Sequence, residues 1–231
     1  MQVRVGTSGF SYAPWKGSFY PSDLKSGDML RYYAERFSTV EINNTFYRMP
    51  NAATLERWTE ETPESFSFVL KASRRLTHEK RLTDADGTAY LFRTAGALAG
   101  RLGPFLFQLP PFFRKDVARL REFLSWVPED RRVAFEFRHA TWFDDEVYDA
   151  LRSKGAALCL ADTDDAPDPK LVTTADWAYL RLRRTDYDDT ALGAWAQRIL
   201  AQPWNEAWVF FKHEEEGKGP ALAKRLMAHL A

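Results

Sequence analysis

Short apolar runs alternate with longer segments of helical periodicity from one end of the chain to the other. Eight runs stand out, and we predict a β-strand at each, namely at residues 3–6, 39–42, 67–71, 105–109, 133–137, 157–161, 178–182 and 208–211. A strand followed by a helix, repeated along a chain, is typical of a parallel sheet built from βα units. The alternation therefore predicts an α/β fold.

Helices are predicted where apolar residues recur at helical spacing between the strands. These segments are residues 28–37, 52–61, 88–101, 115–126, 144–154, 190–200 and 220–230. Asp28, Asn51, Asp116 and Asp144 stand at helix starts, where a short oxygen-bearing side chain caps free backbone N–H groups. The Asp- and Pro-rich residues 164–174 are expected to hold little helix.

Eight strands with a helix after nearly every one match a closed barrel better than an open sheet, because closure leaves no strand edge. We therefore predict a single (β/α)8 TIM barrel with a parallel eight-stranded closed sheet, as one domain over residues 1–231. An open, doubly wound sheet is the alternative.

Composition and charge restrict the classes of function. The chain is 45% hydrophobic and 28% charged, which is typical of a globular protein, and its 32 basic residues balance 32 acidic ones. Such a balance gives no general attraction to nucleic acid or to an anionic membrane. No signal-like segment or long apolar run occurs, so we expect a cytoplasmic protein. The lone Cys159 lies in an apolar run and is expected to be buried.

In a barrel of this kind, functional side chains lie at the carboxyl ends of the strands. Polar residues occur there on almost every predicted strand: Ser8, Glu41, Asn43, Lys71, Gln108, Glu136, Arg138, Asp162, Arg181, Arg183, Lys212 and His213. We expect Glu41, Lys71, Glu136 and Asp162 to be catalytic, and Ser8, Asn43, Gln108, Arg138, Arg181 and Lys212 to bind substrate.

Strand alternation predicts which of these side chains share a face. Residues two apart point the same way, so Asn43 should accompany Glu41 and Arg138 should accompany Glu136. Three acids against four bases leave one positive charge in excess, which suits an anionic ligand. The alternative is a self-neutralised ring in which Glu41 pairs with Lys71 and Asp162 with Arg181.

Aromatic and basic residues near the strand ends could form a rim around a ligand. We expect Trp15 and Tyr20, in the long aromatic segment 6–21, to stack on a sugar or base, together with Tyr47, Arg48 and Trp142. The alternative for the segment 6–21 is a small core that pins this loop down.

Histidines and glycines give no cofactor signal. His78 and His139 follow strand ends and are expected at the ligand site, but no paired metal-ligand motif accompanies them, so no metal is expected. No glycine-rich loop has nucleotide-binding spacing, so no cofactor is expected either. Lys71, if desolvated, could form a Schiff base.

Several sequence blocks carry a resemblance to a known family. Residues 6–12 (GTSGFSY), 40–47 (VEINNTFY), 106–111 (LFQLPP) and 134–139 (AFEFRH) resemble the YecE-like family (domain of unknown function 72). The resemblance implies a TIM barrel but supplies no activity, and likeness of such barrels to endonuclease IV and sugar isomerases is an analogy of fold. Residues 181–184 (RLRR) and 211–213 (FKH) depart from the family pattern, which reads Arg-Leu-His-Gly and Phe-Asn-Asn at these places.

These observations favour an enzyme, a hydrolase, lyase or isomerase, that uses acid/base chemistry on a small anionic compound, phosphorylated or sugar-containing. Glu136 or Asp162 would be the general base and Glu41 its partner, while the basic residues hold the anion. The alternatives are a nucleic-acid-binding or repair-like protein and a non-catalytic ligand-binding protein.

Overall fold

Eight parallel β-strands form one sheet in the order β1-β8-β7-β6-β5-β4-β3-β2 in the computed structural model, which describes residues 1–165 and 169–231. Their bounds are β1 Gln2–Thr7, β2 Thr39–Ile42, β3 Ser67–Lys71, β4 Leu102–Gln108, β5 Val133–Glu136, β6 Ala157–Asp162, β7 Trp177–Leu182 and β8 Glu206–Phe211. The eight predicted strands are confirmed, with ends that move by a few residues.

The sheet closes where β1 meets β2. Ser8 and Glu41 form a parallel bridge, and the Gly9 amide donates to the Glu41 carbonyl at 2.7 Å. Gly6 makes this approach sterically feasible, because a Cβ atom there would lie 2.2 Å from the carbonyl oxygen of Thr39. The predicted closed barrel is therefore confirmed, although β1 and β2 share fewer hydrogen bonds than the other pairs.

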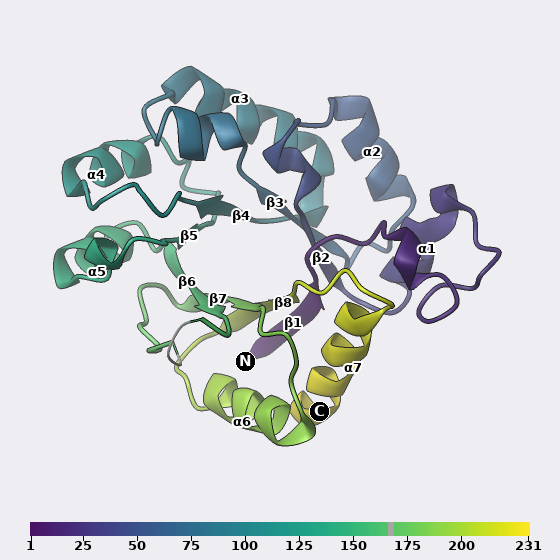
Figure 1. The fold of residues 1–231 in the computed structure, drawn as a ribbon. Helices are drawn as coiled ribbons and strands as arrows, with labels where there is room; N and C mark the ends of the chain where they lie inside the picture. Colours follow the sequence, from purple (N-terminus) through teal and green to yellow (C-terminus); the bar gives the residue numbers. More distant parts are fainter. Residues whose placement is uncertain (166–168) are drawn as a thin grey trace.

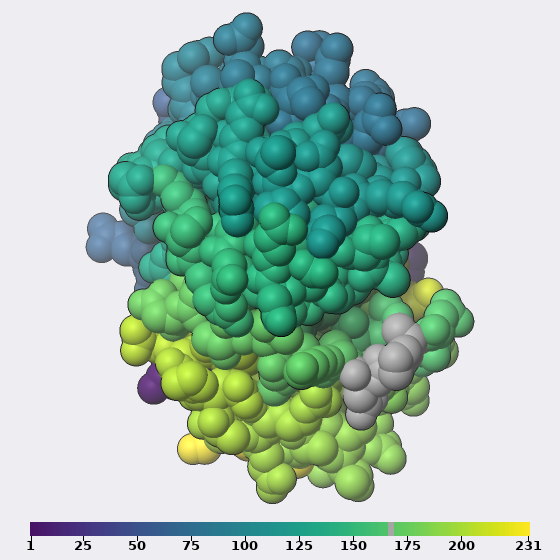
Figure 2. Space-filling model, turned by 90° about the vertical axis from the view of Figure 1, so that its left-hand side faces the viewer, coloured from purple at the N-terminus to yellow at the C-terminus, as the bar shows by residue number. Residues whose placement is uncertain are grey.

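Helices surround the strands as an outer ring (Figure 1). In the described residues the α-helices are α1 Met29–Ala34, α2 Ala52–Glu60, α3 Ala85–Ala95, α4 Val117–Ser125, α5 Asp145–Arg152, α6 Asp189–Leu200 and α7 Lys218–Leu230. Side chains of α4 and α5 cover one flank of the barrel (Figure 2). None of the helices in the described ranges is long and apolar enough to cross a membrane.

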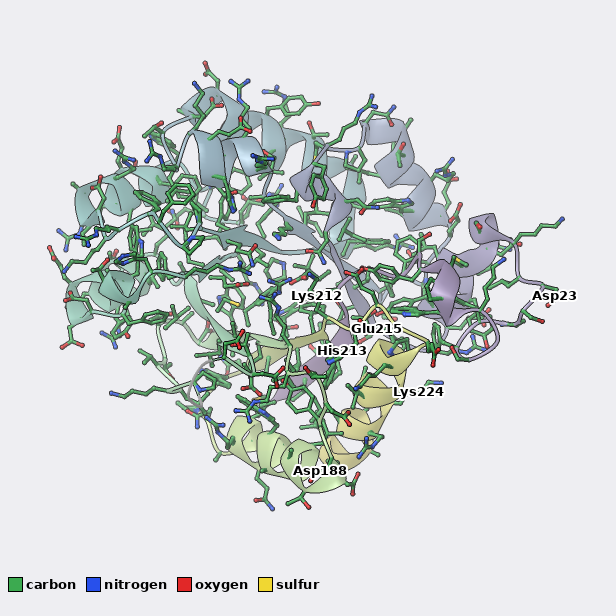
Figure 3. The ribbon with its side chains drawn as sticks, in the orientation of Figure 1. Asp23, Asp188, Lys212, His213, Glu215 and Lys224 are labelled. Carbon is green, nitrogen blue, oxygen red and sulfur yellow. The ribbon has the colours of Figure 1, made fainter. Side chains whose placement is uncertain are left out.

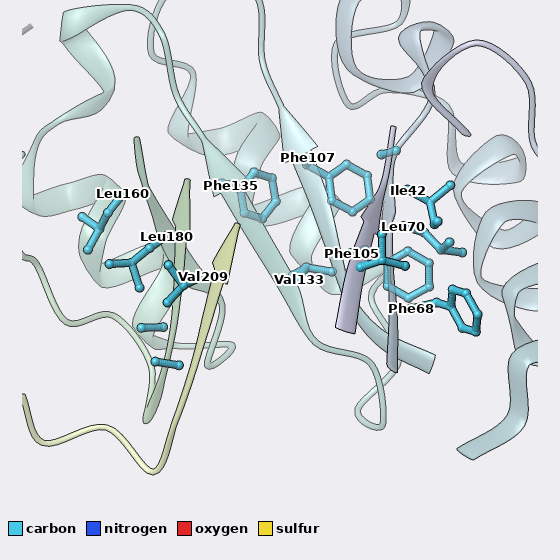
Figure 4. Close-up of a cluster of buried hydrophobic side chains, with 14 of the residues drawn as sticks. Ile42, Phe68, Leu70, Phe105, Phe107, Val133, Phe135, Leu160, Leu180 and Val209 are labelled. Atoms are coloured by element: carbon cyan, nitrogen blue, oxygen red, sulfur yellow. The ribbon is translucent and has the colours of Figure 1, made fainter. Parts of the chain in front are cut away.

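Apolar side chains fill both faces of the sheet. Outside the barrel, Phe68, Phe105, Phe135 and Val209 belong to the large core between strands and helices (Figure 4). Inside it, a second cluster fills the barrel: Val69, Leu106, Ala134, Ala157, Cys159, Trp177, Tyr179, Trp208 and Phe210. The burial expected for Cys159 is confirmed, and with it the interior is a packed core rather than a pore.

Helix starts follow the predicted capping residues with one exception. Asn51, Asp116 and Asp144 accept hydrogen bonds from backbone N–H groups of α2, α4 and α5, as predicted. Asp28 makes no such bond, because a short 3₁₀ turn, Ser26–Asp28, runs directly into α1 and leaves its side chain without that geometry. The prediction that Asp28 caps a helix is therefore wrong.

The predicted helix at residues 88–101 is the least accurate of the set. The helix α3 begins three residues earlier, where Asp84 accepts a hydrogen bond from the Gly87 amide. It also ends sooner, because Ala99 adopts φ 47° within the following turn, Gly96–Arg101. In the described part of residues 164–174 there is no helix, in agreement with the prediction for that segment.

Candidate functional site

Arg181 lies at the centre of a buried charged cluster at the carboxyl ends of the strands. Its side chain is 1% exposed. Nη1 donates to Glu136 Oε2 at 2.5 Å, and Nη2 donates to Glu41 Oε1 at 2.9 Å. One guanidinium from β7 thereby joins a carboxylate of β5 to a carboxylate of β2. The two carboxylates raise the pKa of Arg181 well above its usual value, although burial acts in the opposite direction.

Glu136 is held by basic and amide side chains on all sides. Besides Arg181, its Oε1 accepts from Gln108 at 2.7 Å and from Arg138 at 3.1 Å, and Arg183 Nη1 lies 3.5 Å away. Burial alone would raise the pKa of this carboxyl group. The charges of Arg181, Arg138 and Arg183 outweigh that effect and lower the pKa to about 2.

Glu41 is held in a similar way on the opposite side of the barrel mouth. Its Oε2 accepts a hydrogen bond from the Tyr179 hydroxyl at 2.6 Å, and its Oε1 accepts one from Asn43 at 3.3 Å. Arg181 again lowers the pKa against the effect of burial. The same-face pairs predicted from strand alternation, Asn43 with Glu41 and Arg138 with Glu136, are confirmed. Ser8 is buried beside Glu41 on the neighbouring strand.

Two further cations, Arg183 and Lys212, lie at the mouth with carboxylate partners at longer distances, 3.5 and 4.0 Å. Burial lowers the pKa of Arg183 and of Lys212, and in each case the repulsion of Arg181 adds to the effect. Lys212 follows β8 at the centre of the view in Figure 3, and its Nζ lies 4.0 Å from Glu214 Oε1. Five cationic residues thus lie at the mouth against the three carboxylates of Glu41, Glu136 and Glu214, namely Lys71, Arg138, Arg181, Arg183 and Lys212. The excess of positive charge is larger than the single charge predicted.

Lys71 is the unusual member of this group. In the described part of the chain, its Nζ has no carboxylate oxygen within 4.0 Å and no hydrogen-bond partner, and it lies 4.4 Å from the centroid of the Phe46 ring. The ion pair between Glu41 and Lys71, which was the alternative, is therefore not formed, because the carboxylate oxygens of Glu41 accept hydrogen bonds from Arg181, Tyr179 and Asn43. Burial, together with repulsion by Arg181, lowers the pKa of Lys71 to about 8.

His78 packs against the same Phe46 ring, edge to face, with centroids 5.1 Å apart. It lies in a π-helical turn, Arg75–Glu79, that follows β3. The Thr77 hydroxyl donates to the Ser73 carbonyl, so at 2.9 Å from His78 Nδ1 it acts as acceptor. This network places the proton on Nδ1 and leaves Nε2 as an acceptor. Burial and the nearby Lys71 lower the pKa of His78, which favours this neutral form.

Asp162 does not join the site. Its carboxylate accepts hydrogen bonds from Arg184 at 2.7 Å, from the Tyr187 hydroxyl at 2.9 Å and from the Trp195 indole at 3.1 Å. Trp195 lies on α6, outside the barrel, so Asp162 points away from Arg181. The place at the mouth predicted for Asp162 is therefore wrong, and its alternative pair with Arg181 is not formed. The strand residue opposite Asp162 is Leu182, on the outer face of β7, which explains its direction.

His213 also lies on the outer face. Its Nε2 donates to the Arg184 carbonyl at 2.6 Å, and its ring packs on Tyr187 and Phe211. Of the two residues that follow β8, only Lys212 contributes to the mouth.

Three of the aromatic side chains expected to stack on a ligand are buried instead. Trp15 and Trp142 are 0% exposed and Tyr20 is 1% exposed. The Trp15 indole donates to the Glu214 carbonyl at 3.0 Å, and the Trp142 indole donates to the Phe113 carbonyl at 2.7 Å. The stacking roles predicted for Trp15, Tyr20 and Trp142 are therefore wrong.

Trp15 and Tyr20 instead form the small core that was the alternative for segment 6–21, whereas Trp142 stacks on Phe137 with centroids 4.6 Å apart. Phe19 packs edge-on against both Trp15 and Tyr20, with centroids 5.8 and 4.7 Å apart. Tyr47, at 81% exposure, and the exposed Arg48 remain on the surface. His139 lies partly exposed and caps the turn Ala140–Trp142.

Sequence reasoning missed two contributors to the site. Tyr179 binds Glu41, and its position two residues before Arg181 on β7 was the available signal, because such residues share a face. Phe46 covers the Lys71 amine, and no sequence signal marks it. The described residues contain no group of three or more His, Cys, Asp or Glu side chains placed to hold a metal ion.

Comparisons with known proteins give relatives along nearly the whole chain. The UPF0759 protein YunF of Bacillus subtilis is 26% identical over 223 residues, which cover 86% of this chain and 75% of YunF. The UPF0759 protein YecE of Escherichia coli is 33% identical over 116 residues, which cover 49% of this chain and 43% of YecE. Neither name assigns an activity.

Solved structures agree with the barrel. A DUF72 family protein of Thermotoga maritima superposes with a TM-score of 0.88 at 27% identity, covering 100% of this chain and 99% of that one. A DUF72 family protein of Enterococcus faecalis, at 19% identity, shares the fold with a TM-score of 0.81, covering 99% and 95%. The family model described as "Protein of unknown function DUF72" matches residues 4–231. With the family match, the YunF and YecE relatives and the shared barrel in agreement, this chain belongs to the DUF72 family.

Proposed function

We propose that the protein is an enzyme that binds a small anionic compound, phosphorylated or sugar-containing, at the carboxyl-terminal mouth of its barrel. The observation that carries the proposal is the unbalanced charge of the mouth. Five cationic residues lie among the three carboxylates of Glu41, Glu136 and Glu214, and Arg181 donates to one oxygen of Glu41 and to one oxygen of Glu136. The remaining positive charge is available to an anion.

The lowered pKa values of the cations support this proposal. For Lys71, Arg183 and Lys212, burial is the first cause of the lowering and repulsion by neighbouring cations adds to it. Groups that repel one another in the free protein are relieved when an anion binds among them. The resemblance to the YecE-like family implies histidine and asparagine at the positions of Arg183 and Lys212, so this part of the charge departs from that pattern.

The proposed roles differ from those suggested by sequence alone. With its pKa lowered to about 2, Glu136 is a poor proton acceptor near neutral pH. Glu136 and Glu41 instead hold the guanidinium groups in place. The pKa of Lys71, about 8, lies near neutrality, and burial lowers the pKa of His78, so that its neutral imidazole can accept a proton; we therefore assign the acid/base chemistry to these two residues.

Calorimetric titration with glycerol 3-phosphate and with inorganic phosphate tests the binding, with glycerol as the uncharged comparison. We expect saturable binding of the phosphates that Arg183→Gln weakens by ten- to a hundredfold, because a charge-assisted hydrogen bond is worth roughly 1.5–3 kcal/mol. Arg121→Gln is the matched control, since it removes one positive charge from an exposed position on α4. This control variant should bind like the wild type.

Two results would contradict the proposal. One is that Arg121→Gln weakens the binding of the phosphates as much as Arg183→Gln does, because the effect would then depend on the net charge of the protein and not on a contact at the mouth. The other is tight, steeply salt-dependent binding of a single-stranded oligonucleotide together with no binding of either phosphate, which would favour the nucleic-acid alternative.

A further inference from the structure

We infer that the Lys71 amine is a nucleophile that forms an imine with the carbonyl group of an anionic aldehyde or ketone bound at the barrel mouth. The inference rests on the proposed anion site and adds a substrate class to it. It is carried by the placement of Lys71, which differs from that of every other cation at the mouth.

Lys71 has room to react because nothing else holds its amine. Arg138, Arg181 and Arg183 all contact Glu136, and Lys212 reaches Glu214. In residues 1–165 and 169–231, Lys71 Nζ has neither an ion pair nor a hydrogen bond.

The backbone that carries Lys71 is fixed. The Thr45 hydroxyl lies 2.7 Å from the Lys71 carbonyl oxygen and 2.8 Å from the Ile42 carbonyl oxygen, tying the end of β3 to that of β2. On the side chain, the Phe46 ring covers the amine at 4.4 Å. A positioned stem with an unpaired amine is the arrangement that a nucleophile needs.

The surroundings also favour the neutral amine. Burial has the largest effect on the pKa of Lys71 and repulsion by Arg181 the next, and together with Arg138 they outweigh the attraction of Glu41 and Glu136, whose oxygens accept hydrogen bonds from other donors. The pKa of about 8 leaves a fraction of Lys71 unprotonated at neutral pH, whereas a solvated lysine titrates near 10.4. An ion pair with a carboxylate would instead have raised the pKa of Lys71.

The reaction is balanced as follows. The Nζ lone pair attacks the carbonyl carbon, the C=O π pair moves to oxygen, and a proton passes from nitrogen to that oxygen to give a carbinolamine. Protonation of its hydroxyl group and departure of water form the C=N bond. The neutral amine, the carbonyl compound and one proton thus give an iminium and one water. The neutral imidazole of His78, packed on the same Phe46 ring, is the nearby group suited to carry protons.

The test uses glyceraldehyde 3-phosphate with cyanoborohydride, which reduces an imine to a stable secondary amine that peptide mass spectrometry can locate. We expect labelling of Lys71 in the wild type and its loss in Lys71→Arg, which keeps the charge but cannot form the imine. Glycerol 3-phosphate should compete, and unphosphorylated glyceraldehyde should label about tenfold less, since it lacks the charge-assisted contacts.

Lys224 supplies the matched control. Its Nζ also lies over a phenylalanine ring, 5.3 Å from the centroid of Phe19, but on the exposed outer surface of α7 (Figure 3). The variant Lys224→Arg should leave the labelling of Lys71 unchanged. In the wild type, labelling of Lys71 should rise with a midpoint near pH 8. This pH profile needs no variant and stands even if Lys71→Arg folds poorly.

The outcomes separate this inference from the proposed function. Binding of glycerol 3-phosphate with no label on Lys71, or with labels spread evenly over exposed lysines, overturns the imine and leaves the anion site intact. Absence of both binding and label overturns the anion site as well. A label on Lys71 whose midpoint lies near that of a solvated lysine contradicts the argument from burial.

Discussion

At the scale of single residues, the buried guanidinium of Arg181 decides the form of the site. Its two carboxylate partners, Glu41 on β2 and Glu136 on β5, come from strands other than β7, which carries Arg181. Burying charge is costly unless partners and hydrogen bonds compensate, and here each charge has both. The consequence is that Glu41 and Glu136 are committed to Arg181 and Lys71 is left without a carboxylate.

The variant Arg181→Met should therefore destabilise the protein strongly. It leaves two buried carboxylates without their shared partner, and breaking a buried pair from one side costs about 3–5 kcal/mol. Urea unfolding followed by circular dichroism measures the loss.

Arg183→Met is the control for this experiment, because Arg183 is partly exposed and lies 3.5 Å from the same Glu136. Its loss should cost less than about 1 kcal/mol. Equal costs for the two variants would show that the central position of Arg181 is not what matters.

At the scale of elements, the carboxyl ends of the strands and the short turns that follow them carry the site, while the helices support it. The turn Asn44–Phe46 brings Phe46 over Lys71, and the π-helical turn after β3 brings His78 onto the same ring. The helices α2 to α6 begin at side-chain caps, including Asp84 and Asp188, which sequence reasoning did not identify. Support and function are thus divided between different elements.

Asp188→Ala should destabilise the protein by about 1 kcal/mol, the usual cost of losing an N-cap. Asp188 Oδ1 accepts a hydrogen bond from the Ala191 amide at 2.7 Å at the start of α6 (Figure 3). Asp28→Ala is the control, because Asp28 precedes α1 without capping it. Thermal unfolding of both variants checks the difference, and Asp188→Asn should restore most of the stability. An equal loss in the two alanine variants would contradict the role given to the cap.

At the scale of the whole molecule, closure of the barrel brings strand ends from the first and the second half of the chain together around one mouth. Arg181 on β7 reaches Glu41 on β2 only because β1 lies between β8 and β2. That closure depends on the close approach of β1 to Thr39, which Gly6 permits. An open sheet of the same strands would leave Glu41 far from Arg181.

Gly6→Ala should thus destabilise the barrel by about 1–3 kcal/mol, the range found for overpacking a filled site. The contact is with backbone, which cannot move aside as a flexible side chain can. Gly27→Ala is the matched control, because a Cβ atom there meets nothing within 4 Å, and it should change stability by less than about 0.5 kcal/mol. Urea unfolding of the two variants distinguishes them. A Gly6→Ala protein as stable as the Gly27→Ala protein would contradict the closure argument.

The sequence by itself determined the order of strands and helices, the barrel and the pairs of residues that share a face on one strand. These properties depend on local periodicity, which the backbone geometry of each element fixes. Asn43 beside Glu41 and Arg138 beside Glu136 were predictable for this reason. The sequence also showed which strands end in polar side chains.

Only the tertiary structure decided which way β6 faces and which carboxylate each cation takes. Strand β6 is buried or nearly so on both faces, so no alternation of polar and apolar residues reveals that Asp162 points outward. Likewise, Glu41 pairs with Arg181 and not with Lys71 because the fold brings side chains of distant strands together. The burial of Trp15 and Trp142 has the same origin, because a ring's exposure is set by what packs over it.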